Sequence, residues 1–193
     1  NSQSLSHNLV RTIYEDSRGH LWVGTLGGGL NQLDRQNNRF IRYQDDPSNP
    51  NSLSNNTVFG LYEDVTGALW ITTDNGVNKY DPGHNQFAHY YHNPLQPNGL
   101  NNNQIGAIYT DNGMLWIGTK GGGLNKLDRP TDTVTHYQHN PNNPHSLSNN
   151  LVIAIRPDST GALWIGTEGG GLNWFDPKTE KFIHYQHDPK NPN

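Results

Sequence analysis

Apolar residues occur along this chain in short runs separated by residues that favour turns. In the first quarter of the sequence the runs are Val10–Glu15, Leu21–Thr25, Leu30–Leu33 and Phe40–Tyr43. They have the length of β-strands and are rich in β-branched and aromatic residues, whereas Gly, Ser and Asn lie between them. No segment combines the length and the periodicity of about 3.6 residues that a helix requires. The pattern therefore predicts an all-β chain.

The same pattern of runs and turns returns four times. A Leu-Trp pair marks each copy, and the tryptophans lie 48, 46 and 48 residues apart, at Trp22, Trp70, Trp116 and Trp164. Copies one, three and four continue with a Gly triplet, which the second copy lacks. Four antiparallel strands in a repeat of about 40–50 residues are typical of a β-propeller blade. We predict one β-propeller segment over residues 1–193, with blades at 1–48, 49–95, 96–143 and 144–193.

The second strand of each copy indicates how the blades pack. Side chains alternate along a strand, so Trp22 and Gly24 face one side and their neighbours face the other. Both sides are apolar, as expected for a sheet that lies between two others. We expect Gly24 to leave room for the adjacent blade. Thr72 holds this place in the second copy and predicts looser or rearranged packing there.

An aspartate precedes the first Gly-containing turn of every copy. These residues are Asp16, Asp64, Asp111 and Asp158. A carboxylate in such a place can accept hydrogen bonds from the amides of the turn. A metal site is the alternative interpretation, but repetition at four tight turns favours the structural role.

The segment Ile13–Leu30, which reads IYEDSRGHLWVGTLGGGL, resembles the repeat of the two-component regulator propeller family. The linking phrase Asp46–Asn56 is also typical of that family, and the resemblance covers essentially the whole chain. It implies a periplasmic or extracellular sensor propeller of bacterial hybrid histidine kinases and related signalling proteins, many of them associated with polysaccharide use. It further implies binding without catalysis and without a cofactor.

The family usually has more than four blades, so how this array is closed is an open question. Terminal blades expose apolar faces unless a neighbour covers them. The four blades close into a small ring, two chains form an eight-bladed ring, or the chain is a fragment of a longer one. We favour the paired ring, which makes a second copy of the chain an expected partner.

We expect a ligand on the face that carries the Gly triplets and the Ser-Leu-Ser-Asn-Asn loops. The residue after the second strand differs in every copy: Leu26, Asp74, Lys120 and Glu168. A varied residue in a repeated frame suits a binding surface, although a solvated loop tip explains it equally well. Asparagines near the start of the first strand either face the ligand or hold the loop: Asn8, Asn56, Asn103 and Asn150. The expected ligand is a glycan or another small molecule, and Trp174 either stacks on a sugar or packs in the outer blade.

Other site chemistries have little support. The Gly triplets are followed by no helix and by no Gly-Lys-Ser/Thr phrase, which argues against a phosphate loop. Six histidines repeat on the outermost strand and just beyond it, too far apart to share an ion: His89, His92, His136, His139, His184 and His187. Asp74 and Glu168 are the one candidate acid–base pair, and no Gly-x-Ser-x-Gly elbow occurs. Some propellers are lyases or glycan-active enzymes, but we predict a binding module or, alternatively, a self-assembling scaffold.

The composition of the chain argues against further classes of function and site. The net charge of −4 argues against binding to nucleic acid. The absence of cysteine excludes disulfides and thiolate sites. No apolar run reaches the roughly 18 residues of a membrane-spanning helix, so we expect no membrane contact from this segment.

Overall fold

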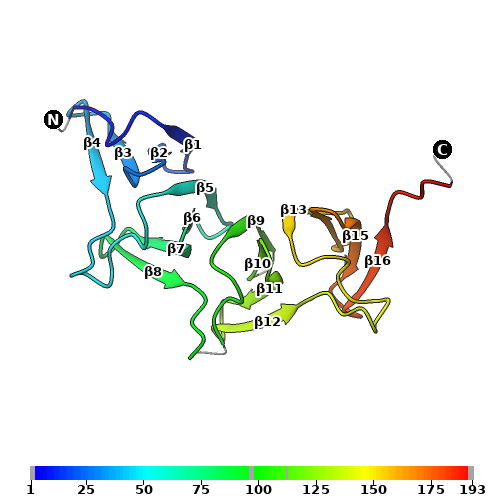
Figure 1. The fold of residues 1–193 in the computed structure, drawn as a ribbon. Helices are drawn as coiled ribbons and strands as arrows, with labels where there is room; N and C mark the ends of the chain where they lie inside the picture. Colours follow the sequence, from blue (N-terminus) through cyan, green and yellow to red (C-terminus); the bar gives the residue numbers. More distant parts are fainter. Residues whose placement is uncertain (1–2, 96–97, 112, 191–193) are drawn as a thin grey trace. The chain divides into compact units, whose positions relative to one another are not determined.

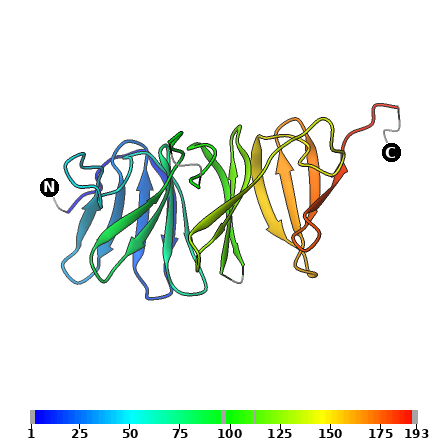
Figure 2. The same cartoon turned by 90° about the horizontal axis from the view of Figure 1, so that it is seen from below.

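The computed structural model describes residues 3–95, 98–111 and 113–190. Its regular structure consists of four separate sheets, each a meander of four antiparallel strands in chain order (Figures 1 and 2). The described part of the chain contains no helix, and therefore none that could cross a membrane. The prediction of an all-β chain with four propeller blades is confirmed.

The strands fall where the apolar runs predict them. Blade 1 contains β1 (Val10–Glu15), β2 (Leu21–Thr25), β3 (Leu30–Asp34) and β4 (Arg39–Tyr43). Blade 2 contains β5 (Val58–Glu63), β6 (Leu69–Thr73), β7 (Gly76–Asp81) and β8 (Gln86–Tyr90). Blade 3 contains β9 (Ile105–Asp111), β10 (Met114–Thr119), β11 (Gly123–Asp128) and β12 (Thr133–Tyr137). Blade 4 contains β13 (Val152–Pro157), β14 (Leu163–Thr167), β15 (Gly171–Asp176) and β16 (Lys181–Tyr185).

The chain divides into two compact units, residues 1–91 with blades 1 and 2 and residues 92–193 with blades 3 and 4. In unit 1, Trp22 of β2 packs on Tyr80 of β7, with ring centroids 5.2 Å apart. Leu30, Leu53 and Val58 complete this core and are fully buried. Unit 2 repeats the arrangement with Trp116, Leu124, Leu147, Val152 and Phe175. Each large side chain buried in this way contributes about 1.5–3 kcal/mol, so the blade interface is the main source of stability.

The glycine of the second strand allows this close packing. A Cβ atom on Gly24 would lie 2.6 Å from Cγ1 of Val58, and one on Gly118 would lie 2.4 Å from Cγ1 of Val152. Real Cβ atoms do not approach carbon this closely, so the valine of the next blade occupies the space that glycine leaves. The expected room for a neighbouring blade is present in both units, while the change predicted at Thr72 stays a prediction.

Candidate functional site

In blades 1 and 2, the aspartate before the first turn accepts hydrogen bonds from the turn and also from a tryptophan. Asp16 accepts hydrogen bonds at Oδ1 from the amides of Arg18 (3.0 Å) and His20 (2.8 Å), and at Oδ2 from the indole N–H of Trp22 (2.8 Å). Asp64 makes the same three kinds of bond in blade 2, to Thr66, Ala68 and Trp70. In blade 1 the carboxylate therefore connects the turn to Trp22, the tryptophan of the blade interface in unit 1. The bonds to the turn follow the sequence pattern, whereas the bond to the indole was not predicted.

Blades 3 and 4 depart from this arrangement. Four residues separate Asp16 from Leu21, but only three separate Asp111 from Leu115. As a result Asp111 lies inside β9, opposite Met114. Asp111 thus pairs with a residue of the next strand, whereas the four-fold repetition predicts that it precedes the turn and accepts hydrogen bonds from the amides of that turn.

In blade 4, Asp158 retains the bonds to the turn but receives an indole from another strand. Its Oδ2 accepts from the indole N–H of Trp174 (2.9 Å), which belongs to β15. The Thr160 hydroxyl and then Trp174 lower the pKa of Asp158 to about 2, because both donate to its charged form. Trp174, the tryptophan outside the repeated frame, is thus held in place by a carboxylate.

A fully buried asparagine on the third strand holds the loop that enters each blade. Asn78 accepts from the Ser54 amide (2.9 Å) and donates to the Ser54 hydroxyl (2.8 Å). The equivalent residues Asn31 and Asn173 form the same reciprocal pair with Ser6 and Ser148. Sequence reasoning assigned these asparagines no role, although an asparagine recurs two residues after the glycine that begins or precedes the third strand in every blade.

Asn56 connects blade 2 to blade 1. Its carbonyl accepts from the amides of Gly27 (3.0 Å) and Gly29 (2.7 Å), and its Oδ1 accepts from the Asp45 amide (2.9 Å). Asn150 makes the same bonds in unit 2, to Gly121, Gly123 and His139. We call these three hydrogen bonds the asparagine clasp. They show the loop-holding role that was one of the two alternatives for these positions.

The two remaining asparagines of the predicted set differ from each other. Oδ1 of Asn103 accepts from the His92 amide (2.5 Å), as in the clasp. Asn8, in the first blade, is exposed, and its carbonyl accepts from the Val10 amide (3.1 Å). The side-chain oxygens of Asn56, Asn103 and Asn150 are therefore occupied by backbone amides.

The varied positions after the second strand share one backbone contact. The amides of Leu26, Asp74, Lys120 and Glu168 each donate to the carbonyl of the residue before the first strand of the same blade. The side chains of Asp74, Lys120 and Glu168 are exposed, while Leu26 is half-buried. Asp74 belongs to unit 1 and Glu168 to unit 2, so neither unit by itself brings these two carboxylates together.

The repeated histidines also hold loops. Nε2 of His89, His136 and His184 lies 2.6–2.9 Å from the carbonyls of Ser52, Gly99 and Ser146. Nδ1 of His92 and His139 makes similar contacts with the carbonyls of Leu100 and Leu147. A carbonyl oxygen only accepts, so each of these nitrogens carries the proton. Among the described residues no three His, Asp or Glu side chains are grouped to bind a metal.

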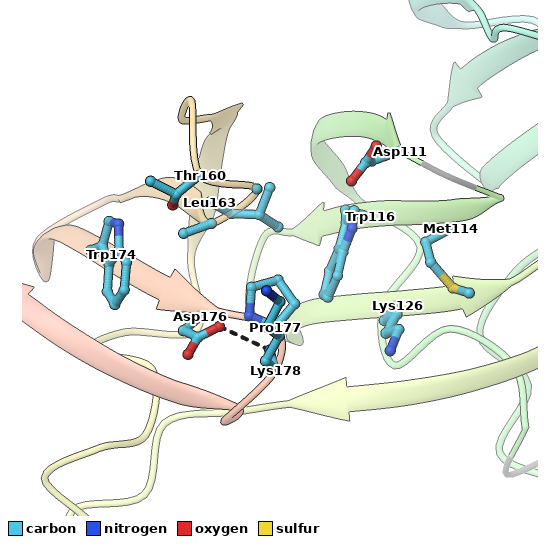
Figure 3. A pocket seen from close by; sticks show the side chains of 12 residues that line it. Asp111, Met114, Trp116, Lys126, Thr160, Leu163, Trp174, Asp176, Pro177 and Lys178 are labelled. Atoms are coloured by element: carbon cyan, nitrogen blue, oxygen red, sulfur yellow. Dashed lines mark hydrogen bonds between the residues drawn. The ribbon is translucent and has the colours of Figure 1, made fainter.

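A crevice of about 490 Å³ opens between blades 3 and 4 of unit 2 (Figure 3). Trp116 and Trp174 stand on opposite sides of it, with the segment 176–178 between them. The charged lining residues are Asp111, Lys126, Asp176 and Lys178, and the others include Met114, Thr160, Leu163 and Pro177. Trp174, for which stacking on a sugar was one of two alternatives, lines this crevice, whereas none of the eight residues predicted at the ligand face does.

The corresponding residues of unit 1 line two spaces, one of about 400 Å³ and one of about 50 Å³. The larger one is lined by the counterparts of Thr160, Gly161, Ala162, Trp174, Asp176 and Pro177, which are Thr66, Gly67, Ala68, Lys79, Asp81 and Pro82. The smaller one lies where blade 1 meets blade 2. It is lined by Arg18 and His20, which lie on the longer first turn of blade 1, and by Tyr80. Blade 3 has one residue fewer in that turn, and Phe175 replaces Tyr80 in blade 4. The crevice of unit 2 therefore corresponds to both spaces of unit 1 together, and Trp174 takes the place of Lys79 in its lining.

Two of the charged residues in the crevice, Lys126 and Asp176, interact with neighbouring groups of the protein. The ammonium of Lys126 lies 5.7 Å from the centroid of the Trp116 ring, where a cation–π interaction holds it. The backbone amide of Lys178 and then the Thr179 hydroxyl lower the pKa of Asp176, which keeps this carboxylate ionised at neutral pH. The crevice thus offers two indole surfaces, ammonium donors and carboxylate acceptors, a set suited to binding a small polar molecule with an apolar face.

The crevice and the predicted ligand face lie at opposite ends of the strands. Met114, which lines the crevice, begins β10, and Lys120 follows its last residue. Six residues of strand span roughly 20 Å at about 3.3 Å per residue. The signals that could have indicated the crevice are the shortened first turn of blade 3 and the additional tryptophan of blade 4.

The chain matches the model of a protein family described as two component regulator propeller, at residues 4–27, 52–75, 99–121 and 146–169. Each match covers the linking loop, the first two strands and the turn after them. A search of curated proteins finds no match.

Solved structures agree with this family. The chain is 29% identical to the extracellular domain of the hybrid two-component system BT3049 from B. thetaiotaomicron, with a TM-score of 0.77 over 95% of this chain. It is 27% identical to the extracellular domain of BT4673 from the same organism, with a TM-score of 0.75 over 92% of this chain. It spans 24% and 25% of those two chains.

The computationally designed protein Ika4 has the same fold. It is 14% identical, with a TM-score of 0.59, and 95% of this chain covers 96% of the designed one. At that identity the likeness concerns the fold alone. From the four repeated matches and the two similar extracellular domains, we conclude that this chain belongs to the two-component regulator propeller family.

Proposed function

We propose that the chain is a non-enzymatic, ligand-binding segment of a sensor propeller located outside the cytoplasmic membrane. The family match and the extracellular domains of two similar proteins support the location. The same family match supports a binding rather than a catalytic role.

The ligand we propose is a small glycan bound in the crevice of unit 2. The observation that carries this proposal is the crevice of about 490 Å³ that both Trp116 and Trp174 line, whereas Lys79 holds the place of Trp174 in unit 1. Ligand pockets for small molecules have volumes of about 300–1,000 Å³. Indole rings stack on the apolar face of a sugar, while Lys126 and Asp176 supply a donor and an acceptor for its hydroxyl groups.

Indole fluorescence titration tests this proposal, because two tryptophans line the crevice. Cellobiose, maltotriose, xylotriose and a chondroitin disaccharide are titrated into the intact chain. At least one should change the emission saturably and raise the midpoint of thermal unfolding. Trp174→Ala and Lys126→Ala should each weaken that binding at least tenfold.

Matched controls lie at the predicted ligand face. Lys120→Ala and Glu168→Ala remove exposed charges of the same unit and should leave the affinity unchanged. If these two variants lose binding while Trp174→Ala keeps it, the ligand occupies the opposite face and the crevice assignment is wrong. If none of the four glycans binds, the glycan proposal fails.

A further inference from the structure

The larger space of unit 1, about 400 Å³ in volume, is lined by two cations at places where unit 2 has none. Lys79 of β7 lines it in the place that Trp174 holds in the crevice of unit 2. Arg18, on the first turn of blade 1, lines it from the neighbouring blade. The shorter first turn of blade 3 contains no Arg or Lys between Asp111 and Met114. This pair of charges is therefore specific to unit 1.

Hydrogen bonds across the blade interface hold Arg18 beside blade 2. The amide and the hydroxyl of Ser17 donate to the carboxylate of Glu63 in β5, over 2.8 and 2.6 Å. The amide of Arg18 itself donates to Oδ1 of Asp16 (3.0 Å). A Cβ atom on Gly67 would lie 3.7 Å from Nη2 of Arg18, so the guanidinium lies against the first turn of blade 2. The fold thus brings this charge from one blade to the surface of the next.

An aromatic ring, rather than an acid, holds the ammonium of Lys79. This group lies 5.7 Å from the centroid of the Trp70 ring, on the residue that pairs with Lys79 in the ladder. A ring face stabilises the charge but leaves the three N–H donors of the ammonium available. Lys79 is half-buried, and Tyr90, Pro82 and Ala88 supply apolar surface to the same space.

The carboxylates close to these cations already have donors of their own. Asp81 accepts from the amide of Gly83 (2.8 Å) and contacts Nδ1 of His84 (2.8 Å). Glu63 holds the first turn of blade 1, and Asp64 holds that of blade 2. Within the described ranges neither of the two cations belongs to an ion pair. Two positive charges therefore face the space without an acidic partner.

We propose that this space is a binding site for a small organic carboxylate, separate from the glycan crevice of unit 2. The carboxylate group of the ligand lies between Arg18 and Lys79, and its carbon skeleton lies on Tyr90 and Pro82. Hydrogen bonds between ionised groups are roughly twice as strong as neutral ones, so an acid gains more here than an amide or an alcohol. All the lining residues belong to unit 1.

Isothermal titration calorimetry on the intact chain tests this proposal with matched pairs of probes. Benzoate and benzamide have the same shape but differ in charge, and glucuronate and glucose differ in one carboxylate. At constant ionic strength, at least one of the two acids should bind about tenfold more tightly than its neutral partner. Sulfate, the inorganic anion, should bind more weakly than that acid, because it has no carbon skeleton to contact Tyr90.

Charge-removing variants assign the binding to the two cations. Arg18→Gln and Lys79→Gln should each weaken binding of the acid about fivefold or more, whereas Lys79→Arg should retain it. Arg35→Gln is the matched control, because Arg35 is an exposed cation of blade 1 that pairs with Glu15 (3.2 Å), and it should leave the affinity unchanged. Thermal unfolding of each variant shows whether it is folded.

Trp174→Ala separates this proposal from the glycan proposal. It removes an indole of the crevice in unit 2 and should leave binding of the acid unchanged, whether or not any glycan binds there. If this variant loses the acid while Lys79→Gln keeps it, the anion occupies unit 2 and the assignment to unit 1 is wrong.

The remaining outcomes also decide the matter. If neither acid binds, or if each binds no better than its neutral partner, the proposal is overturned. Equal losses in Arg18→Gln and Arg35→Gln overturn it as well, because they indicate a general attraction of anions to blade 1. Sulfate that binds as tightly as the acids supports the pair of cations but overturns the organic ligand.

Discussion

At the scale of single residues, polar side chains inside this fold act as connectors. The buried asparagines of the third strand join a strand to the loop entering the same blade, and the aspartates of the first turn join a turn to an indole. Among the described residues no buried side-chain nitrogen or oxygen lacks a partner. Removing one connector therefore leaves its partner unsatisfied, which costs more than the bond itself contributes.

Asn78→Ala should lower the free energy of unfolding by about 1–3 kcal/mol, because the Ser54 amide and hydroxyl lose their buried partner. Urea unfolding monitored by fluorescence measures this loss. Asn51→Ala, at an exposed loop position of the same blade, is the control and should change stability by less than about 0.5 kcal/mol. Equal losses in both variants would contradict a special role for the buried asparagine.

Asp64 should contribute to the loss of stability in acid. Burial alone would raise its pKa, but the hydrogen bonds from Thr66 and Trp70 outweigh burial and hold the pKa below its usual value of 3.8. Because the native pKa is lower than the unfolded one, the contribution is fully present above about pH 5 and disappears as the pH falls below 3.8 through the native pKa.

Asp64→Asn therefore tests this pH dependence. Its unfolding free energy should be lower than wild type at pH 6, and the difference should shrink toward pH 3. Urea titrations at several pH values give both curves. A difference that stays constant over this range would show that ionisation of Asp64 does not contribute.

At the scale of elements, each blade is a four-stranded meander whose second strand packs against the next blade. Strand β10 carries Trp116 and Gly118 on one face, and the next blade places Phe175 against the ring and Val152 against the glycine. The same large and small residues alternate on β2. This pairing explains why Gly occurs inside a strand, where its flexibility would otherwise be unfavourable.

Gly118→Ala should destabilise unit 2 by about 1–3 kcal/mol, since the new methyl group would lie 2.4 Å from Cγ1 of Val152. Gly166→Ala in β14 is the matched control, because its methyl group would approach nothing closer than 3.3 Å. Chemical unfolding of the two variants should separate them clearly. A similar loss in both would mean that strand propensity, rather than the neighbouring valine, requires glycine.

At the scale of the whole molecule, stability depends on pairs of blades. Each unit buries its tryptophan between two sheets, and the same interfaces enclose the crevices. In a repeat array of this kind the energy is a sum of blade terms and nearest-neighbour terms.

Much of the fold could be predicted from the sequence because its signals are local. The strands follow from alternating apolar runs, the turns from Gly and Asn, and the four blades from the spacing of the tryptophans. The candidate ligand face rested on the four varied positions after the second strand, and the crevice lies away from it. Trp174 was recognised as unusual, but its partner Asp158 lies sixteen residues away and joins it only through the folded sheet.

The sequence by itself determined the strand pattern, the repeat and the family, since each depends on residue order within one blade. The tertiary structure alone decided the asparagine clasp, the valine opposite glycine and the lining of the crevice, which depend on contacts between separate sheets, and the indole bonds, which join a turn to a strand of the same blade. A small change such as one residue fewer before Met114 alters this geometry without altering the repeat.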